Sequence, residues 1–316
     1  MLMQDNYTKN KSGLLAGLGV STQKLLELNK KRVKGEKTEM DDLQFELWKS
    51  LLESRTGMSL PDNRKSFLVA NLGMRMTELG ITSFQAYYDH VQSGLNGSVE
   101  WDQLLHHLTV HETRFLRHQS TLDLIQRHCL PQTLAPATSK IKPTTINIWS
   151  VGCSTGEEPY SIAMTVDEQM LANGYTYYLG IIASDISRNA LAKGREGTYS
   201  ARQVSKISQE WRLRYFQKLS GNKYQVIPNM RQRVCFNHLN ILDMGDTPIG
   251  NMDVIVCQNV LIYYDKKRRL EIADSLVKYL APGGMLIFAV GELLHWPNER
   301  MIRFQYPDTL AYRLQS

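Results

Sequence analysis

WSVGCSTGEEP, residues Trp149 to Pro159, is the stretch that decides the fold. An apolar, strand-like run ends in a turn with two glycines, and the next segment begins with Glu157 and Glu158. A glycine-bearing turn between a strand and a helix brings the backbone close to a ligand, and the helix N-terminus behind it favours anions. Two carboxylates at that point would repel a phosphate. The pattern therefore predicts a ligand other than a pyrophosphate.

Outward from this turn, apolar segments alternate with helical ones. We expect strands at 146–151, 177–184, 252–257 and 285–290, and helices at 159–171, 189–193 and 266–280. This alternation is typical of an α/β fold, in which helices cover both faces of a parallel sheet.

Two further pairs of short segments are predicted to form antiparallel hairpins. Residues 224–227 and 234–239 would make a small inserted hairpin at about 222–239. Residues 304–306 and 310–314 would add an antiparallel edge, which makes the main sheet a mixed one.

The remaining chain divides by composition. Residues 1–39 show no sustained period and are expected to be a mobile basic arm, whereas 40–130 have apolar residues at helical spacing and predict a helical N-terminal domain. Three prolines at 131–145 indicate a linker, and the α/β domain would occupy 146–316.

Composition and charge exclude several classes of protein. The longest apolar runs fall far short of the roughly 20 residues that a membrane span requires, so we expect no membrane insertion. Four scattered cysteines without a CxxC pair fit a reducing compartment, the cytoplasm by default, and predict no metal site. Residues 1–39 hold eight Lys/Arg and four Asp/Glu, which is +4 of the net +6. The folded part is therefore near +2, and no nucleic-acid partner is expected.

Polar side chains follow each predicted parallel strand. In open α/β sheets, ligands lie beyond the carboxyl ends of the strands. The candidates there are Gly152, Glu157, Asp185, Asn240, Ile241, Gln258, Asn259 and Tyr263. Asp185, at the end of the second strand, is well placed to accept hydrogen bonds from the two hydroxyls of a ribose.

NAD and S-adenosylmethionine (SAM) both contain such a ribose, and the glutamates separate the two ligands. SAM carries a sulfonium and an ammonium group and no phosphate, so a carboxylate near the turn favours it, whereas NAD would bring a like charge. A GxGxxG pattern is also absent. Alternatively, Glu157 and Glu158 only stabilise a helix N-terminus, each by about 0.3–1 kcal/mol.

Taken together, the motifs resemble one family. They are HETRFLR (111–117), WSVGCSTGEEPYSIAM (149–164), ASDIS (183–187), FNHLNIL (236–242), DVIVCQNVLIYYD (253–265) and LAPGG (280–284). In this order they are similar to the CheR-type chemoreceptor glutamate methyltransferases, from about residue 42 to the C-terminus.

The resemblance implies a Rossmann-like class I methyltransferase sheet with a small β-hairpin subdomain, after an all-helical domain. It implies methyl transfer from SAM to glutamates on the cytoplasmic domain of methyl-accepting chemoreceptors, with S-adenosylhomocysteine as product. The family's cofactor contacts fall on His111, Thr113, Arg117, Glu157, Asp185, Asn240, Ile241, Gln258 and Asn259. Arg117 and Tyr263 match the positions that orient the accepting carboxylate.

The sequence departs from the family pattern at several points. His111 stands where the family usually has Asn, and Gln258 where it usually has Arg, which predicts an altered cofactor affinity. The helix at 64–79 is poorer in arginine than usual, and the segment 290–296 resembles the PilK-like branch that serves type IV pilus signalling. Two alternatives stay open: a receptor-docking module without turnover, and a methyltransferase acting on an amine or nucleobase.

Overall fold

The computed structural model describes residues 40–109, 112–134, 143–245, 247 and 249–315. The chain divides into two compact units, the described residues of Met1–Trp48 with Asn63–Glu100, and those of Lys49–Asp62 with Trp101–Ser316. The division falls inside two helices, α3 (Asp42–Thr56) and α6 (Gly94–Leu108). The arm predicted at 1–39 lies outside the described residues.

The first unit is helical, as its apolar spacing predicts. After the 3-10 turn η1 (Asp62–Arg64), its complete helices are α4 (Lys65–Leu79) and α5 (Phe84–Val91). In α4, Leu68, Leu72 and Met76 are buried, so every fourth residue faces the core. The helix ends at Gly80, whose φ of 68° suits a glycine cap.

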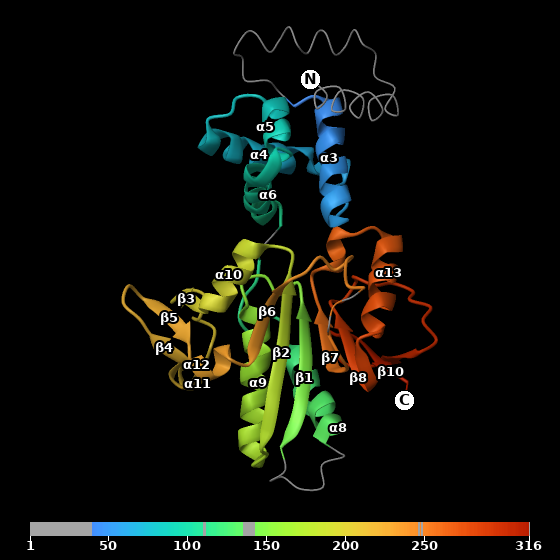
Figure 1. Ribbon diagram of the computed structural model, residues 1–316. Coiled ribbons are helices and arrows are strands. Elements are labelled where there is room, and N and C mark those ends of the chain that lie inside the picture. The colour runs from blue at the N-terminus through green and yellow to red at the C-terminus, as the bar shows by residue number, and fades with distance from the viewer. Residues whose placement is uncertain (1–39, 110–111, 135–142, 246, 248, 316) are drawn as a thin grey trace. The chain divides into compact units, whose positions relative to one another are not determined.

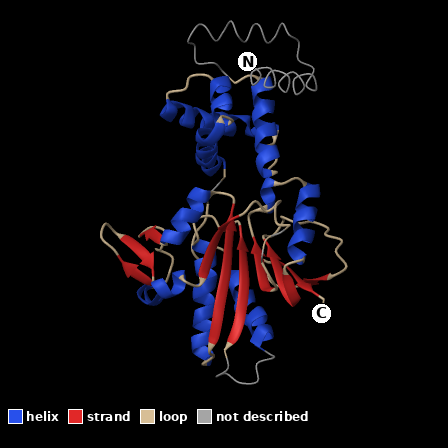
Figure 2. Cartoon of the chain, viewed as in Figure 1, coloured by secondary structure: helices blue, strands red, loops and turns tan. Residues whose placement is uncertain are grey.

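The second unit contains a seven-stranded sheet in the order β6-β2-β1-β7-β8-β10-β9 (Figures 1 and 2). The strands are β1 (Thr144–Val151), β2 (Tyr177–Asp185), β6 (Val234–His238), β7 (Met252–Cys257), β8 (Leu280–Phe288), β9 (Met301–Phe304) and β10 (Leu310–Leu314). All neighbours pair in parallel except β10, which is antiparallel to both β8 and β9. The mixed sheet with an antiparallel edge is thereby confirmed.

Helices pack against this sheet and complete its core. The helix α9 (Glu157–Asn173) and the helix α10 (Arg188–Glu196) contact β2 and β6, and α13 (Lys266–Val277) contacts β8 (Figure 1). The central strand β1 has consecutive buried residues from Ile148 to Val151, because both of its faces are covered.

The linker predicted from prolines begins as a helix. The helix α7 (Gln119–Leu124), a π-helical segment η2 (Ile125–Cys129) and α8 (Leu130–Leu134) follow one another without interruption. Pro131 is the second residue of α8 and directly follows the π-helical segment, so the helical run continues through this proline. Residues 135–142 lie outside the described part of the chain, and β1 begins at Thr144.

The pairing predicted for 224–227 with 234–239 is wrong. The strand β5 (Lys223–Val226) pairs antiparallel with β3 (Thr198–Ser200) and β4 (Phe216–Lys218) in a separate three-stranded sheet, next to α11 (Gln209–Tyr215). The strand β6 joins the main sheet instead, parallel to β2. The intervening segment explains the difference, since it forms α12 (Pro228–Arg231) with proline in its first turn and so separates β5 from β6.

The pairing register brings the carboxyl ends of four parallel strands to one edge. Val151 of β1 is opposite Ser184 of β2 and Cys257 of β7, and Asp185 of β2 is opposite His238 of β6. The turns that follow these strands therefore share one edge of the second unit.

Candidate active site

The turn after β1 is built around Gly152. Its φ is 70°, and its N–H donates to the carbonyl of Ser184 at 2.8 Å. A Cβ at this position would lie 2.3 Å from Cγ2 of Val260, in the segment after β7. Glycine is required here for two reasons, the left-handed backbone and the close approach of a second strand-end loop.

Asp185 fastens this turn to the end of β2. Its two carboxylate oxygens accept the backbone N–H groups of Ser154 and Ser187, each at 2.8 Å. Burial raises the pKa of Asp185, while these two bonds lower it. Each oxygen has a second lone pair, so the carboxylate can still accept hydrogen bonds from the hydroxyls of a ligand.

Glu157 is 1% exposed at the start of α9. Its carboxylate accepts hydrogen bonds from the Thr155 hydroxyl at 2.6 Å and from Nε2 of Gln203 at 3.1 Å. Burial raises its pKa, and the bond from Thr155 lowers it. The carboxylate is thus held at the turn, behind Gly156.

Glu158 points to a different partner. The hydroxyl of Ser150 in β1 donates to its Oε1 at 2.6 Å. Burial raises the pKa of Glu158 to about 7, the Ser150 bond and the charge of Arg117 lower it, and Glu292 raises it. The second glutamate is half-buried and is held by β1, whereas the first is held at the turn.

The segment that contains Arg117 is anchored to α9. The N–H of Leu116 donates to the Ser161 hydroxyl at 2.9 Å, and that hydroxyl donates to the carbonyl of Glu157 at 2.6 Å. The Arg117 guanidinium donates to the carbonyl of Glu112 and is half-buried. Thr113 is half-buried nearby in sequence, and His111 lies outside the described residues.

The loop after β7 is tied to the start of α7. Gln258 is 6% exposed, and its Nε2 donates to the Thr121 hydroxyl at 3.0 Å and to the carbonyl of Phe288 at 3.3 Å. Asn259 has a φ of 61°, and its Oδ1 lies 2.8 Å from Nε2 of His118. Burial lowers the pKa of His118, and Nε2 is the donor of this bond because an amide oxygen can only accept.

These two partners, His118 and Thr121, escaped the sequence prediction. They follow Arg117 directly and could have been found only by noticing that polar side chains continue after the HETRFLR motif. Tyr263 lies in the 3-10 helix η3 (Leu261–Tyr263), is half-buried, and accepts the N–H of Ser59 at its backbone carbonyl at 2.8 Å.

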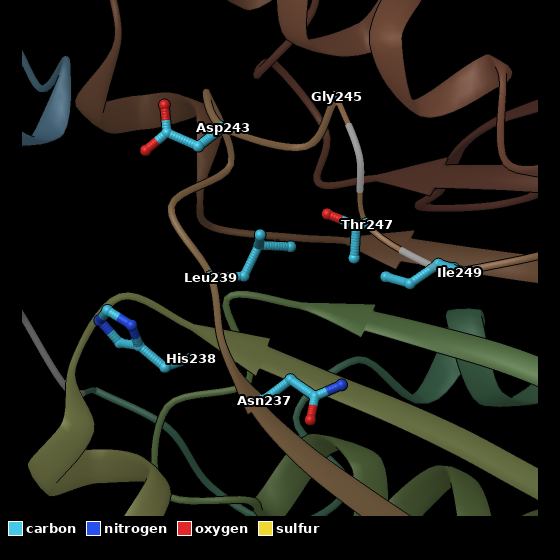
Figure 3. Close-up of a pocket in the computed structure, with 7 residues that line it drawn as sticks. All are labelled: Asn237, His238, Leu239, Asp243, Gly245, Thr247 and Ile249. Atoms are coloured by element: carbon cyan, nitrogen blue, oxygen red, sulfur yellow. The ribbon is translucent and has the colours of Figure 1, made fainter.

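Asn240 and Ile241 follow β6 beside a cavity. Asn240 accepts the N–H of Leu242 at 3.2 Å, a bond that fixes the turn, and Ile241 is 7% exposed. The cavity measures about 560 Å³ and is lined by Asn237, His238, Leu239, Asp243, Gly245, Thr247 and Ile249 (Figure 3). The two predicted residues are not part of this lining, although Leu239 before them and Asp243 shortly after them are.

The comparisons with known proteins agree with this arrangement. The family model "CheR methyltransferase, all-alpha domain" matches residues 43–109, and "CheR methyltransferase, SAM binding domain" matches residues 111–308.

Similar curated proteins are chemotaxis protein methyltransferases. One from Vibrio cholerae is 31% identical over 252 residues, which are 79% of this chain and 85% of the relative. One from Pseudomonas aeruginosa is 30% identical over 272 residues, 85% of this chain and 97% of the relative. One from Escherichia coli is 30% identical over 255 residues, 79% of this chain and 84% of the relative. By both comparisons, this chain belongs to the CheR methyltransferases.

Proposed function

We propose that this chain methylates glutamate side chains on the cytoplasmic helices of methyl-accepting receptors and so produces glutamate methyl esters for sensory adaptation. Membership of the CheR family makes it a SAM-dependent methyltransferase. The observation that carries the choice of acceptor is Arg117, a half-buried cation in the segment that Leu116 and Ser161 tie to the start of α9. A fixed guanidinium suits a carboxylate acceptor, because it can bind one through two parallel hydrogen bonds.

The residues at the edge fit SAM. Asp185 presents free lone pairs to ribose hydroxyls, and Glu157 and Glu158 provide negative charge where a sulfonium and an ammonium group would bind. When bound, SAM supplies an electrophilic methyl group with a neutral thioether as leaving group. Because that leaving group needs no proton, no general acid is required.

The work of the protein is positioning. The acceptor glutamate, with a reference pKa of about 4.3, is already ionised at neutral pH. We assign Arg117 and Tyr263 to orienting its carboxylate, and the strand-end loops to excluding water from it. Correct alignment of reacting groups can contribute roughly 7–11 kcal/mol to lowering a barrier.

The partner and the location are part of the proposal. The cytoplasmic domain of a methyl-accepting receptor is the partner that the acceptor chemistry favours, and the protein would act in the cytoplasm. Among the described residues, no helix has the length and apolar character to cross a lipid bilayer. The basic residues at 1–39 are available to tether the enzyme near such a partner.

Calorimetry tests the cofactor site first. SAM and S-adenosylhomocysteine should bind and NAD should not, and Asp185→Ala should abolish the binding. Since Asp185 also accepts two backbone N–H groups, the circular dichroism spectrum and melting temperature of the variant must be recorded as a control.

Methyl transfer then tests the acceptor. Radiolabelled SAM should label the cytoplasmic fragment of a receptor as a base-labile ester, and Arg117→Ala and Tyr263→Phe should lower kcat. Binding of both adenosyl ligands without transfer to any receptor fragment would favour a docking module. Base-stable labelling would indicate a nitrogen acceptor instead. Unchanged kcat in both variants would contradict the roles assigned to Arg117 and Tyr263.

A further inference from the structure

Three segments meet at the rim of the active site in the second unit. They are η3 with Ile262, the first turn of α13, and the loop at 290–294 that follows β8. Glu292 joins them, because it is 2% exposed and its carboxylate accepts the N–H of Ala289 at 2.9 Å; burial raises its pKa, and the backbone of Ala289 and of residues 259, 260 and 262 lowers it.

Arg269 completes this connection from α13. Its Nε donates to the carbonyl of Tyr264 at 2.8 Å, and its Nη1 donates to the carbonyl of Glu292 at 3.1 Å. The three segments therefore form one continuous surface beside Tyr263, which we call the η3–α13 rim.

The η3–α13 rim exposes apolar side chains. Ile262 is 53% exposed, Val290 is 69% exposed and Leu294 is 70% exposed. A single exposed aliphatic residue is ordinary on a protein surface, but several that adjoin a ligand site indicate a contact with a partner.

The same rim is positively charged. Lys266, Lys267 and Arg268 are exposed, and the carboxylate of Glu271 lies 3.9 Å from Lys267 and 3.1 Å from Arg268. They occupy the first turn of α13, where the helix dipole disfavours cations. Such a local conflict with helix stability is expected where function requires the charge.

The cations of α4, by contrast, are engaged inside the first unit. Lys65 pairs with Asp42, and Arg75 pairs with Glu78 and with Glu100, which is 5% exposed. These are the lysine and the arginine that α4 contains. The arginine of α4 is therefore neutralised by a buried carboxylate, whereas Lys266, Lys267 and Arg268 of the η3–α13 rim are exposed and lie beside the partly exposed carboxylate of Glu271.

We propose that the η3–α13 rim is the docking surface for an acidic, amphipathic helix that carries the acceptor glutamate. Acidic side chains of that helix pair with Lys266, Lys267 and Arg268, and its apolar side chains cover Ile262, Val290 and Leu294. Charge complementarity selects this occupant, because the acceptor is itself an anionic residue. The inference rests on the proposed function and names the part of this chain that recognises the substrate.

The test compares two double charge reversals. Lys266→Glu with Lys267→Glu changes the rim, and Lys278→Glu with Arg300→Glu makes the same change of net charge just before β8 and β9, at the opposite edge of the sheet. Acidic residues at the start of α13 favour the helix, so the rim variant is expected to fold. KM and kcat are measured with a receptor cytoplasmic fragment, together with the Kd of S-adenosylhomocysteine.

We expect the rim variant to raise KM roughly tenfold at low salt, with kcat and the cofactor Kd unchanged. The difference should shrink as ionic strength rises, because the charges are exposed. The opposite-edge variant should stay within about twofold of the wild type, since nonspecific effects of net charge are common to both. Leu294→Ser should also raise KM, whereas Leu213→Ser, a similarly exposed leucine in α11, should not.

Equal KM values for the two double variants would overturn the inference, as would a loss confined to kcat. Binding of the fragment, followed by fluorescence anisotropy in the presence of S-adenosylhomocysteine, separates this outcome from failure of the proposed function. A wild type that binds the fragment through the rim without methylating it would refute the proposed reaction and support the docking surface. Rim-dependent binding to anionic phospholipid vesicles, with no effect on the fragment, would refute docking of a helix.

Discussion

Replacing Gly152 with alanine would test how the strand-end loops are fitted together. Two costs can be worked out from the structure. The φ of 70° places a non-glycine residue in the left-handed region, which costs about 1–2 kcal/mol. The added Cβ would also lie 2.3 Å from Cγ2 of Val260, and overpacking of this kind costs roughly 1–3 kcal/mol. The free energy of unfolding should therefore fall by about 2–5 kcal/mol.

Gly174 provides a matched control for the first cost. It caps α9 with a φ of 67°, and a Cβ added there meets nothing within 4 Å. Gly174→Ala should therefore show the backbone cost alone, about 1–2 kcal/mol. The difference between the two variants measures the contact with Val260.

The assay is thermal and urea unfolding of both variants, with calorimetric titration of S-adenosylhomocysteine. Gly152→Ala should weaken cofactor binding as well as stability, because displacing Val260 moves the neighbouring Gln258 and Asn259. Adding Val260→Ala should restore part of both losses, since the Cβ of residue 260 would remain at 3.5 Å, an ordinary contact. Equal destabilisation by Gly152→Ala and Gly174→Ala, or no rescue by Val260→Ala, would refute this reasoning.

Further predictions concern three side chains. His118→Phe removes the donor to Asn259 Oδ1 and should weaken S-adenosylhomocysteine binding about fivefold, by ~1 kcal/mol, whereas His118→Gln should restore most of it. Equal Kd values in calorimetry would show that the bond is dispensable. Arg75→Met leaves Glu100 buried without its cation and should lower the free energy of unfolding by about 3–5 kcal/mol. Urea titration measures this loss, and an unchanged unfolding midpoint would contradict the importance of the pair. The raised pKa of Glu158 means that the folded protein binds more protons than the unfolded one between its ordinary value of 4.5 and about 7. The contribution of the Glu158 carboxyl to stability is therefore present below pH 4.5 and is lost as pH rises through about 7. In melting experiments, Glu158→Gln should gain stability relative to the wild type as pH rises from 5 to 8. Parallel pH profiles of the two proteins would exclude this account.

The sequence was most informative where local pattern determines local structure. The strand predicted at 252–257 matches β7, and the helix predicted from residue 266 begins there as α13. It was least informative where pairing depends on distant segments. The strand β6 shows the reason, because nothing in its own residues distinguishes an antiparallel neighbour in sequence from the parallel neighbour β2, about 50 residues earlier.

The candidate site follows the same rule: residues within a motif could be predicted from the sequence, and partners from distant segments could not. The turn residues Gly152 and Asp185 could be placed by motif and by strand order, and the structure puts both at the carboxyl ends of β1 and β2. Their partners could not, because Gln203 and Thr121 reach Glu157 and Gln258 across 46 and 137 residues of sequence. Such contacts follow from tertiary packing, and no spacing rule encodes them.

The two glutamates of the opening motif show how position decides hydrogen-bond partners within one helical turn. Successive residues of an α-helix point about 100° apart, because 3.6 residues complete a turn. Glu157 consequently faces Thr155 and Gln203, and Glu158 faces Ser150 on the neighbouring strand. The hydrogen bonds to both carboxylates come from neutral donors, which satisfy lone pairs without neutralising charge, and burial raises both pKa values. A ligand that brings positive charge would stabilise two carboxylates of this kind, and these pKa directions therefore support the proposal that the motif binds a sulfonium cofactor rather than a pyrophosphate.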